Sequence, residues 1–433
     1  MQNDQRLLTS SPTEKRACIW TLVGCAVRVL RAMIGRMEYS ELAALLFLQM
    51  MATGIWFVPL SRLLSAHGMT ALIPFSYASS AVAAFISPLI FGAMADRHVA
   101  PARVLRWLAI SSAAAVTAAS WSIGHRLPAA AVLSLVLFYS LVSVPTSSIA
   151  SSVVLSRLSD SQRQFGPIRG MGTVGWMVGC WMISLLGFDE SPRLGYTGAG
   201  VWLALALFTF LLPALPPPAG ASMTFKERMG WDALSLLKNH DHRVVFLTVA
   251  LFSIPLAAFY PYTPPQLSEL GFKRTAAWMS LGQITEVTAM FCLSALFARW
   301  RLKWIFAAGI LVAVFRFAFS SLDYPAWLLA GVTLHGFSYT LVYITEQIYL
   351  NERIEPVWRA RAQALMSLMN SGVGNLAGYL GSGFWFGVCT GTDGTRWHLF
   401  WGGLAAAVGA VLVFFLIAYR GRGSGLRRVE TSH

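Results

Sequence analysis

Charged residues are scarce in this chain. Asp, Glu, Lys and Arg make up 12% of its 433 residues, whereas hydrophobic residues make up 56%. Soluble domains carry about 25% charged residues, so this composition excludes a soluble globular protein. The mean hydropathy of +0.59 points the same way. We therefore expect an all-α integral membrane protein, because a bilayer forces long apolar runs to become helices.

Motifs for catalysis and cofactor binding are also missing. The five cysteines form no Cys-x-x-Cys pair, and none stands at metal-ligand spacing from a histidine. This pattern excludes a disulfide framework and a metal site. There is no Walker A loop, nucleophile elbow or metal-binding helix either. We expect no enzyme, no cofactor and no metal, so any energy for work must come from a gradient.

Long apolar runs are what the sequence does contain. A spanning helix needs about 20 apolar residues. Twelve windows of roughly this size predict twelve transmembrane helices: 42–64, 71–94, 102–122, 128–152, 168–188, 197–215, 243–265, 275–298, 303–321, 325–350, 361–386 and 396–418. We number them spans 1 to 12.

The longest polar interruption, 216–242, divides these spans into two groups of six. It begins with a Pro/Gly stretch and continues as an amphipathic segment. The predicted organisation is an N-terminal extension (1–41), a six-helix bundle (42–215), this linker (216–242), a second six-helix bundle (243–418) and a tail (419–433). We expect the extension to contain a surface helix, although Met37 could equally be the natural start.

The excess of basic residues indicates the orientation. The chain carries 33 Lys and Arg against 19 Asp and Glu, for a net charge of +14. The basic residues punctuate apolar segments instead of gathering on a soluble face, which argues against nucleic acid as a partner. They concentrate in the segments that lie inside if both termini are cytoplasmic. We therefore expect a multi-pass protein of the cell inner membrane with both termini in the cytoplasm.

A charged residue opens span 5. Arg169, Thr173 and Trp176 stand at i, i+4 and i+7, so a helix of about 3.6 residues per turn places them on one face. A cation, a hydroxyl and an aromatic plate together can hold a flat polar solute. The alternative is that Arg169 reaches a lipid headgroup and Trp176 anchors the interface.

Two carboxylates fall inside predicted spans. A charge at the bilayer centre costs about 2.5 to 3.5 kcal/mol on insertion scales, which favours a functional role or a paired one. Glu286 lies deep in span 8, three residues after Gln283, and we expect it to bind solute or carry a proton; a structural pair with Arg169 or Arg316 is the alternative. Glu346, near the end of span 10, is an assisting proton carrier or a residue of a cytoplasmic gate.

Small residues and prolines mark two further spans. Span 11 repeats small residues from Asn370 to Gly383, a pattern that favours close helix packing. Span 7 contains four prolines, Pro255, Pro261, Pro264 and Pro265, which predict a bend or an unwound hinge.

Several motifs resemble those of known transporters. Gly92-Ala-Met-Ala-Asp96-Arg97 between spans 2 and 3 resembles the hallmark loop of the major facilitator superfamily. Other segments are similar to the bacterial nucleoside:proton symporters within it: Phe47-Leu-Gln49, Gly54-Ile-Trp56, Ala83-Ala-Phe-Ile-Ser-Pro88, Pro167-Ile-Arg169-Gly-Met-Gly172-Thr173-Val-Gly175-Trp176, Gln283-Ile-Thr-Glu286, His335-Gly-Phe-Ser-Tyr339, Gln347-Ile-Tyr349 and Arg359-Ala-Arg-Ala-Gln363.

This resemblance implies the major facilitator fold and a solute site at the midplane. The implied substrate-binding residues are Arg169, Thr173, Trp176, Gln283, Glu286 and Tyr339, with Gly92, Asp96 and Arg97 as a cytoplasmic gate loop. We add Thr340, the residue after Tyr339, to the expected substrate-binding residues, and we expect Glu286 and Glu346 to be the residues of proton coupling. The chain departs from the family at two places. Thr340 stands where the family has an aspartate, and Ala257-Ala-Phe-Tyr260 of span 7 lacks the family's glutamine and asparagine.

The expected function is import of nucleosides by proton symport, by a protein that acts as a monomer. Because the two departures remove polar partners, a sugar or another small polar metabolite is an alternative solute. From a different class, the protein could be a membrane sensor that keeps the fold without transporting.

Overall fold

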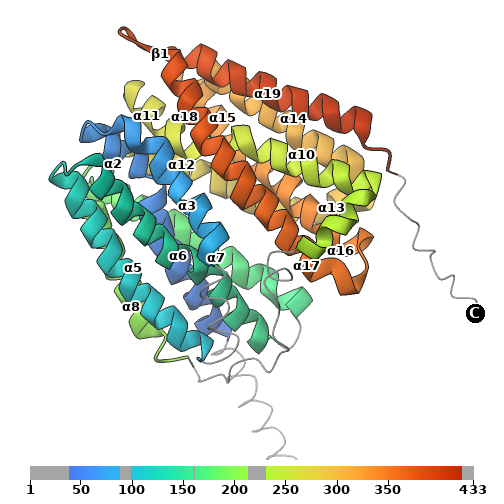
Figure 1. The fold of residues 1–433 in the computed structure, drawn as a ribbon, viewed down its shortest axis with the longest axis horizontal. Helices are drawn as coiled ribbons and strands as arrows, with labels where there is room; N and C mark the ends of the chain where they lie inside the picture. The colour runs from blue at the N-terminus through green and yellow to red at the C-terminus, as the bar shows by residue number, and fades with distance from the viewer. Residues whose placement is uncertain (1–38, 88–98, 159–160, 213–230, 422–433) are drawn as a thin grey trace, which may run out of the picture.

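The computed structural model describes residues 39–87, 99–158, 161–212 and 231–421, and these are almost entirely helical (Figure 1). The first half of the chain forms a helix at 39–57, α2 (Leu60–Ala66), the 3-10 turn η1 (Thr70–Leu72), α3 (Ile73–Ser87), α5 (Pro101–Gly124), α6 (Ala129–Arg157), α7 (Ser161–Leu186) and α8 (Arg193–Phe208).

The second half opens with the 3-10 helix η3 (Trp231–Lys238). Its further elements are α10 (His240–Leu256), α11 (Phe259–Glu269), α12 (Thr275–Met279), α13 (Leu281–Arg299), α14 (Leu302–Ser321), α15 (Pro325–Tyr339), the π-helical turn η4 (Thr340–Ile344), α16 (Thr345–Arg353), α17 (Pro356–Ser367), the π-helical turn η5 (Leu368–Gly374), α18 (Asn375–Cys389), a hairpin of β1 (Thr390–Gly391) and β2 (Gly394–Thr395), and α19 (Trp397–Ala418).

The prediction of an all-helical membrane protein is confirmed. Within the described residues, seven helical stretches are long and apolar enough to cross a membrane: Tyr39–Ala66, Pro101–Gly124, Ala129–Arg157, His240–Glu269, Leu302–Ser321, Pro325–Arg353 and Trp397–Ala418. The other predicted spans also fall on helical segments, but these are shorter or less apolar. The count of twelve spans therefore stays a prediction.

The surface and the interior have the polarity that a bilayer requires. Large apolar side chains point outward, with Phe384 77% and Ile417 79% exposed. Polar side chains are buried instead, and the Gln49 amide donates to the Thr146 hydroxyl at 3.1 Å in the interior. An apolar surface of this kind is a liability in water and the normal state in lipid.

Helices from the same half of the chain pack mainly on one another. α5 lies against α6 and α8, whereas α14 lies against α15 and α19. The halves meet where α3 contacts α18, where α7 contacts α12 and where α2 contacts α11. Figure 1 shows this division, with the blue to green helices on one side and most of the yellow to red helices on the other.

Spans 7, 10 and 11 contain irregular backbone. The prolines of span 7 act as expected: α10 ends at Leu256, one residue after Pro255, and α11 begins at Phe259. Spans 10 and 11 each contain a π-helical turn, η4 and η5, which the sequence pattern did not predict. π turns are rare and concentrate at functional sites, so their positions direct attention to the space between the halves.

Some predicted features lie outside the described residues. These are the gate-loop residues Gly92, Asp96 and Arg97, the N-terminal extension up to residue 38, and the linker from 213 to 230. The end of the linker is described, and there Trp231–Lys238 is a 3-10 helix.

Close contact between α13 and α15 depends on Gly336. A Cβ built on this glycine would lie 2.1 Å from the backbone nitrogen of Glu286 and 2.2 Å from the carbonyl oxygen of Gly282. Because both atoms belong to backbone, neither can move aside as a side chain could. The glycine thus lets α15 contact α13 directly.

We expect Gly336→Ala to destabilise the protein, because the added methyl group must push α13 and α15 apart. Overpacking of this kind costs about 1–3 kcal/mol. The melting temperature in detergent should fall by several degrees. Gly381→Ala on α18 is the matched control, since a Cβ there meets nothing within 4 Å. Equal melting temperatures for the two variants would contradict the proposed contact.

Candidate solute-binding site

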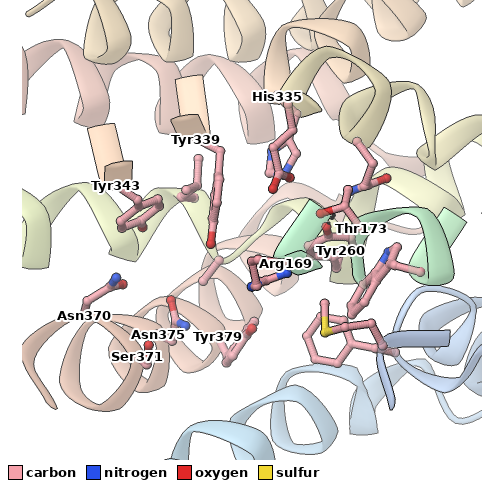
Figure 2. A pocket seen from close by; sticks show the side chains of 17 residues that line it. Arg169, Thr173, Tyr260, His335, Tyr339, Tyr343, Asn370, Ser371, Asn375 and Tyr379 are labelled. Carbon is pink, nitrogen blue, oxygen red and sulfur yellow. Dashed lines mark hydrogen bonds between the residues drawn. The ribbon is translucent and has the colours of Figure 1, made fainter. Parts of the chain in front are cut away.

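A cavity of about 280 Å³ lies between the two halves of the molecule. Its lining residues come from the 39–57 helix, α7, the broken span 7, α13, α15, η4, η5 and α18 (Figure 2). They are Met50, Phe57, Arg169, Thr173, Trp176, Leu256, Ala257, Tyr260, Gln283, Glu286, His335, Tyr339, Tyr343, Asn370, Ser371, Asn375 and Tyr379. The set includes six of the seven residues that the sequence predicted for substrate binding.

The first half contributes the face of α7 predicted from residue spacing. Arg169, Thr173 and Trp176 all line the cavity. A neighbouring face of α7 carries glycines, and a Cβ on Gly175 would lie 2.1 Å from the carbonyl oxygen of Phe47. α7 therefore packs its glycines against the 39–57 helix, and this packing leaves its larger side chains for the cavity.

The second half contributes two polar residues from α13. Gln283 and Glu286 are three residues apart and share a face, as predicted. The Gln283 amide donates to the hydroxyl of Tyr260 at 3.0 Å, which joins α13 to α11. The Tyr260 ring packs on Phe57 (centroids 5.3 Å apart) and on Trp176 (5.9 Å) from the other half. An aromatic cluster thus closes one end of the cavity.

Opposite charges face each other across the cavity. The charge of Arg169, from the first half, acts on the carboxyl of Glu286, from the second. Among the described residues the two form no ion pair within 4 Å, and the Arg169 side chain is exposed. The attraction therefore spans a gap that a solute can enter. Arg316 is not part of this pair: it is buried on α14, where its guanidinium stacks on Phe259 at 4.2 Å.

Three buried polar atoms at the cavity lack a hydrogen-bond partner among the described residues. They are Nε1 of Trp176, Oε1 of Gln283 and Nδ1 of His335. An unsatisfied buried polar group costs about 1–3 kcal/mol, so such atoms mark places where a solute can bind. Trp176 supplies a donor and Gln283 an acceptor. His335 also stacks on Phe259, with ring centroids 4.1 Å apart.

Two predicted residues lie away from the cavity. Thr340 is fully buried, and its hydroxyl donates to the backbone oxygen of Glu286 at 3.4 Å. Thr340 follows Tyr339 directly, so its side chain points in a different direction, toward α13. There it contacts the backbone of Glu286 instead of lining the cavity. Glu346 is buried on α16 and is not among the lining residues.

Sequence reasoning missed several lining residues. The glycines of span 11 pack closely, as predicted, with Gly378 against Ile254 and Ala257. The polar residues between them, Asn370, Ser371 and Asn375, face the cavity instead (Figure 2). Polar amide and hydroxyl groups in an apolar span could have identified these three residues. The prediction for span 11 considered only helix packing.

The halves are bonded directly at the end of the molecule where α7 ends and α12 begins. The carboxylate of Asp189 accepts hydrogen bonds from the Thr275 hydroxyl (3.4 Å) and from the Ala276 N–H (2.9 Å). Nearby, the indole N–H of Trp181 donates to the Ser280 hydroxyl at 2.6 Å. We call these five residues the latch. It closes this end of the cavity.

A polar cavity between two packed helical halves, set in an apolar surface, defines a membrane transporter. The family model described as nucleoside H+ symporter matches residues 37–423. The chain belongs to this family, which confirms the resemblance found in its motifs.

Relatives of known name cover nearly the whole chain. YegT of Escherichia coli is 33% identical over 402 residues, which span 88% of this chain and 93% of YegT. The nucleoside permease NupG of Escherichia coli is 26% identical, covering 87% and 94% of the two chains. The xanthosine permease of the same organism is also 26% identical, covering 88% and 96%.

Solved structures show the fold. The crystal structure of a NupG mutant superposes with a TM-score of 0.82 at 23% identity, covering 88% of this chain and all of that one. An auto-inhibited peptide transporter of the POT family superposes with a TM-score of 0.68 at 11% identity, covering 92% and 99%. The protein therefore has the fold of major facilitator transporters.

We expect Arg169→Ala to weaken nucleoside binding and leave folding intact. The exposed guanidinium forms no ion pair within 4 Å among the described residues, so its loss removes no direct contact that holds the fold. A hydrogen bond to a charged group contributes about 1.5–3 kcal/mol, or at least tenfold in affinity. Binding to purified protein and the melting temperature separate the two effects. Arg299→Ala, an exposed arginine at the end of α13, is the control. Retained binding with a lowered melting temperature would assign Arg169 a structural role.

Proposed function

We propose that this protein imports nucleosides by proton symport, moving them through the cavity by alternating access. The observation that carries the proposal is the charge pair across the cavity: Arg169 and Glu286 come from different halves and face the same space. Family membership and the names of the relatives support nucleosides as the solute and the proton as the coupled ion.

The cavity suits the chemistry of a nucleoside. The half-buried rings of Trp176 and Tyr260 line the cavity and can stack on a flat base. The unpaired atoms of Trp176 and Gln283, a donor and an acceptor, suit the edge of that base. The volume of about 280 Å³ lies near the lower end of the roughly 300–1,000 Å³ typical of ligand pockets. A solute much larger than a nucleoside is thus disfavoured.

The organisation we propose is twelve spans in two bundles of six, 42–215 and 243–418, joined by 216–242. The end that carries η3 is assigned to the cytoplasm, on the strength of the basic residues there, and the latch end to the periplasm. This orientation makes the conformation inward-facing, with the periplasmic end closed. The protein then acts as a monomer in the inner membrane, with both termini in the cytoplasm.

Glu286 is the proposed proton carrier. An ionised Glu286 attracts Arg169, and protonation removes that attraction because the carboxyl becomes neutral. Solute contacts with Arg169 can then replace the lost partner. Glu346 lies off the cavity and has at most an assisting part. The coupling therefore depends on one carboxyl and the cation that faces it.

Flux through reconstituted protein tests the function. Proteoliposomes with an inward-directed proton gradient should accumulate labelled uridine above its outside concentration, and a protonophore should abolish the accumulation. Uptake of sugars but not nucleosides would support the alternative solute. Binding without any accumulation would support a sensor. Liposomes without protein provide the background.

We expect Glu286→Gln to remove proton-driven accumulation and to spare uridine exchange. The amide keeps the size and hydrogen-bonding capacity of the protonated acid but cannot change its charge. Counterflow measures exchange, and uptake driven by a pH gradient measures coupling. Undiminished driven uptake in Glu286→Gln would shift the role to Glu346. Undiminished uptake in Glu286→Gln/Glu346→Gln would exclude coupling through either acid.

A further inference from the structure

The π-helical turn of span 11 brings two asparagines to the same side of the helix. Asn370 lies inside η5 and Asn375 directly follows it. Residues five apart in an α-helix point about 140° apart. A π turn, whose backbone bonds join residues i and i+5, brings such positions into line. Both asparagines consequently line the cavity, together with Ser371 between them (Figure 2).

Packing on the other side of span 11 holds this arrangement. A Cβ on Gly372 would lie 2.6 Å from the ring of Phe85 on α3, and one on Gly374 would lie 2.9 Å from Ser253 on α10. Glycine therefore lets the π turn press against both halves of the protein. The larger polar residues of span 11 lie on the side that faces the cavity.

The two amides have free hydrogen-bonding capacity. Oδ1 of Asn370 accepts from the Ser253 hydroxyl at 2.7 Å, which fixes the orientation of the amide and leaves its NH2 group for the cavity. Asn375 is partly exposed, and its side chain forms no hydrogen bond with any described residue. Asn370 thus offers a donor whose orientation is fixed, and Asn375 offers both a donor and an acceptor.

The cavity has two chemically different ends. Tyr260, Thr173 and His335 mark the aromatic end, which also holds the unpaired atoms suited to a base edge. Asn370 and Asn375 lie toward the other end, where Tyr343 and Tyr379 also line the cavity, and Arg169 lies between the two ends (Figure 2). A nucleoside has a flat base and a ribose rich in hydroxyls. A flat base stacks on aromatic rings, and ribose hydroxyls form hydrogen bonds with amides. This complementarity places the base at the aromatic end and the ribose beside the two asparagines.

We propose that Asn370 and Asn375 bind the ribose hydroxyls and so select ribonucleosides over analogues that lack them. This inference rests on the proposed function and adds the group of the solute that span 11 recognises. Ala257 and Tyr260 of span 7 line the same cavity without an amide group, so among these residues Asn370 and Asn375 supply the amides.

Binding of paired ligands tests the inference. The unsubstituted protein should bind uridine more tightly than 2′,3′-dideoxyuridine. Asn375→Ala and Asn370→Ala should each weaken uridine binding by about three- to tenfold, the loss of one neutral hydrogen bond. Binding of the dideoxy compound should not change, so the selectivity ratio falls. Ser367→Ala, an exposed serine just before the π turn, should leave both affinities unchanged.

Folding effects can be separated from recognition. Asn370→Ala leaves the Ser253 hydroxyl with the carbonyl of Val249 at 2.8 Å and the hydroxyl of Tyr343 at 2.9 Å, so no buried group is left unpaired. Asn375→Leu preserves shape and removes the hydrogen bonds, and it should reproduce the effect of Asn375→Ala. Equal melting temperatures would confirm that these variants fold.

Other outcomes overturn the inference. Equal losses for uridine and dideoxyuridine would place the amides at the base, and unchanged affinities for both ligands in both variants would place them outside the solute contacts. A wild-type protein that does not distinguish the two ligands would also overturn it. These results leave the proposed function standing. Absence of any nucleoside binding by the unsubstituted protein would overturn the proposed function and this inference together.

Discussion

The attraction between Arg169 and Glu286 is the constraint on which the rest of the site depends. Each charge is costly inside a membrane, and neither is neutralised by a direct ion pair in the described residues. Because one belongs to α7 and the other to α13, their mutual stabilisation varies with the separation of the halves. A proton or a polar solute that changes this attraction therefore changes the relative stability of the conformations.

The straight parts of the helices made much of the site predictable. Arg169, Thr173 and Trp176 share a face because α7 is regular over that stretch, and Gln283 and Glu286 do so on α13. The spacing of these polar residues is visible in the sequence alone. The helical fold and the membrane setting follow similarly from composition and the length of the apolar runs.

The remainder depended on irregular backbone and on contacts between distant segments. Ideal spacing cannot reveal that a π turn aligns Asn370 with Asn375, because the turn appears only when helix packing is known. Thr340 depends on a contact of this kind: it follows Tyr339 in the sequence, yet its hydroxyl donates to the backbone carbonyl of Glu286 on α13. Tyr260 reaches the cavity because span 7 breaks after Leu256, and no local pattern gives the direction of the chain beyond such a break.

The latch explains why the charge pair alone cannot set the conformation. Each hydrogen bond to the Asp189 carboxylate contributes about 1.5–3 kcal/mol, and these bonds exist only while the latch end is closed. The free energy lost when that end opens must therefore be offset by new interactions elsewhere in the protein. A solute that touches both halves can supply such interactions only to the extent that it binds one conformation better than the other. The latch and the charged cavity thus act on the same equilibrium, and alternating access requires the closed and open conformations to differ little in free energy.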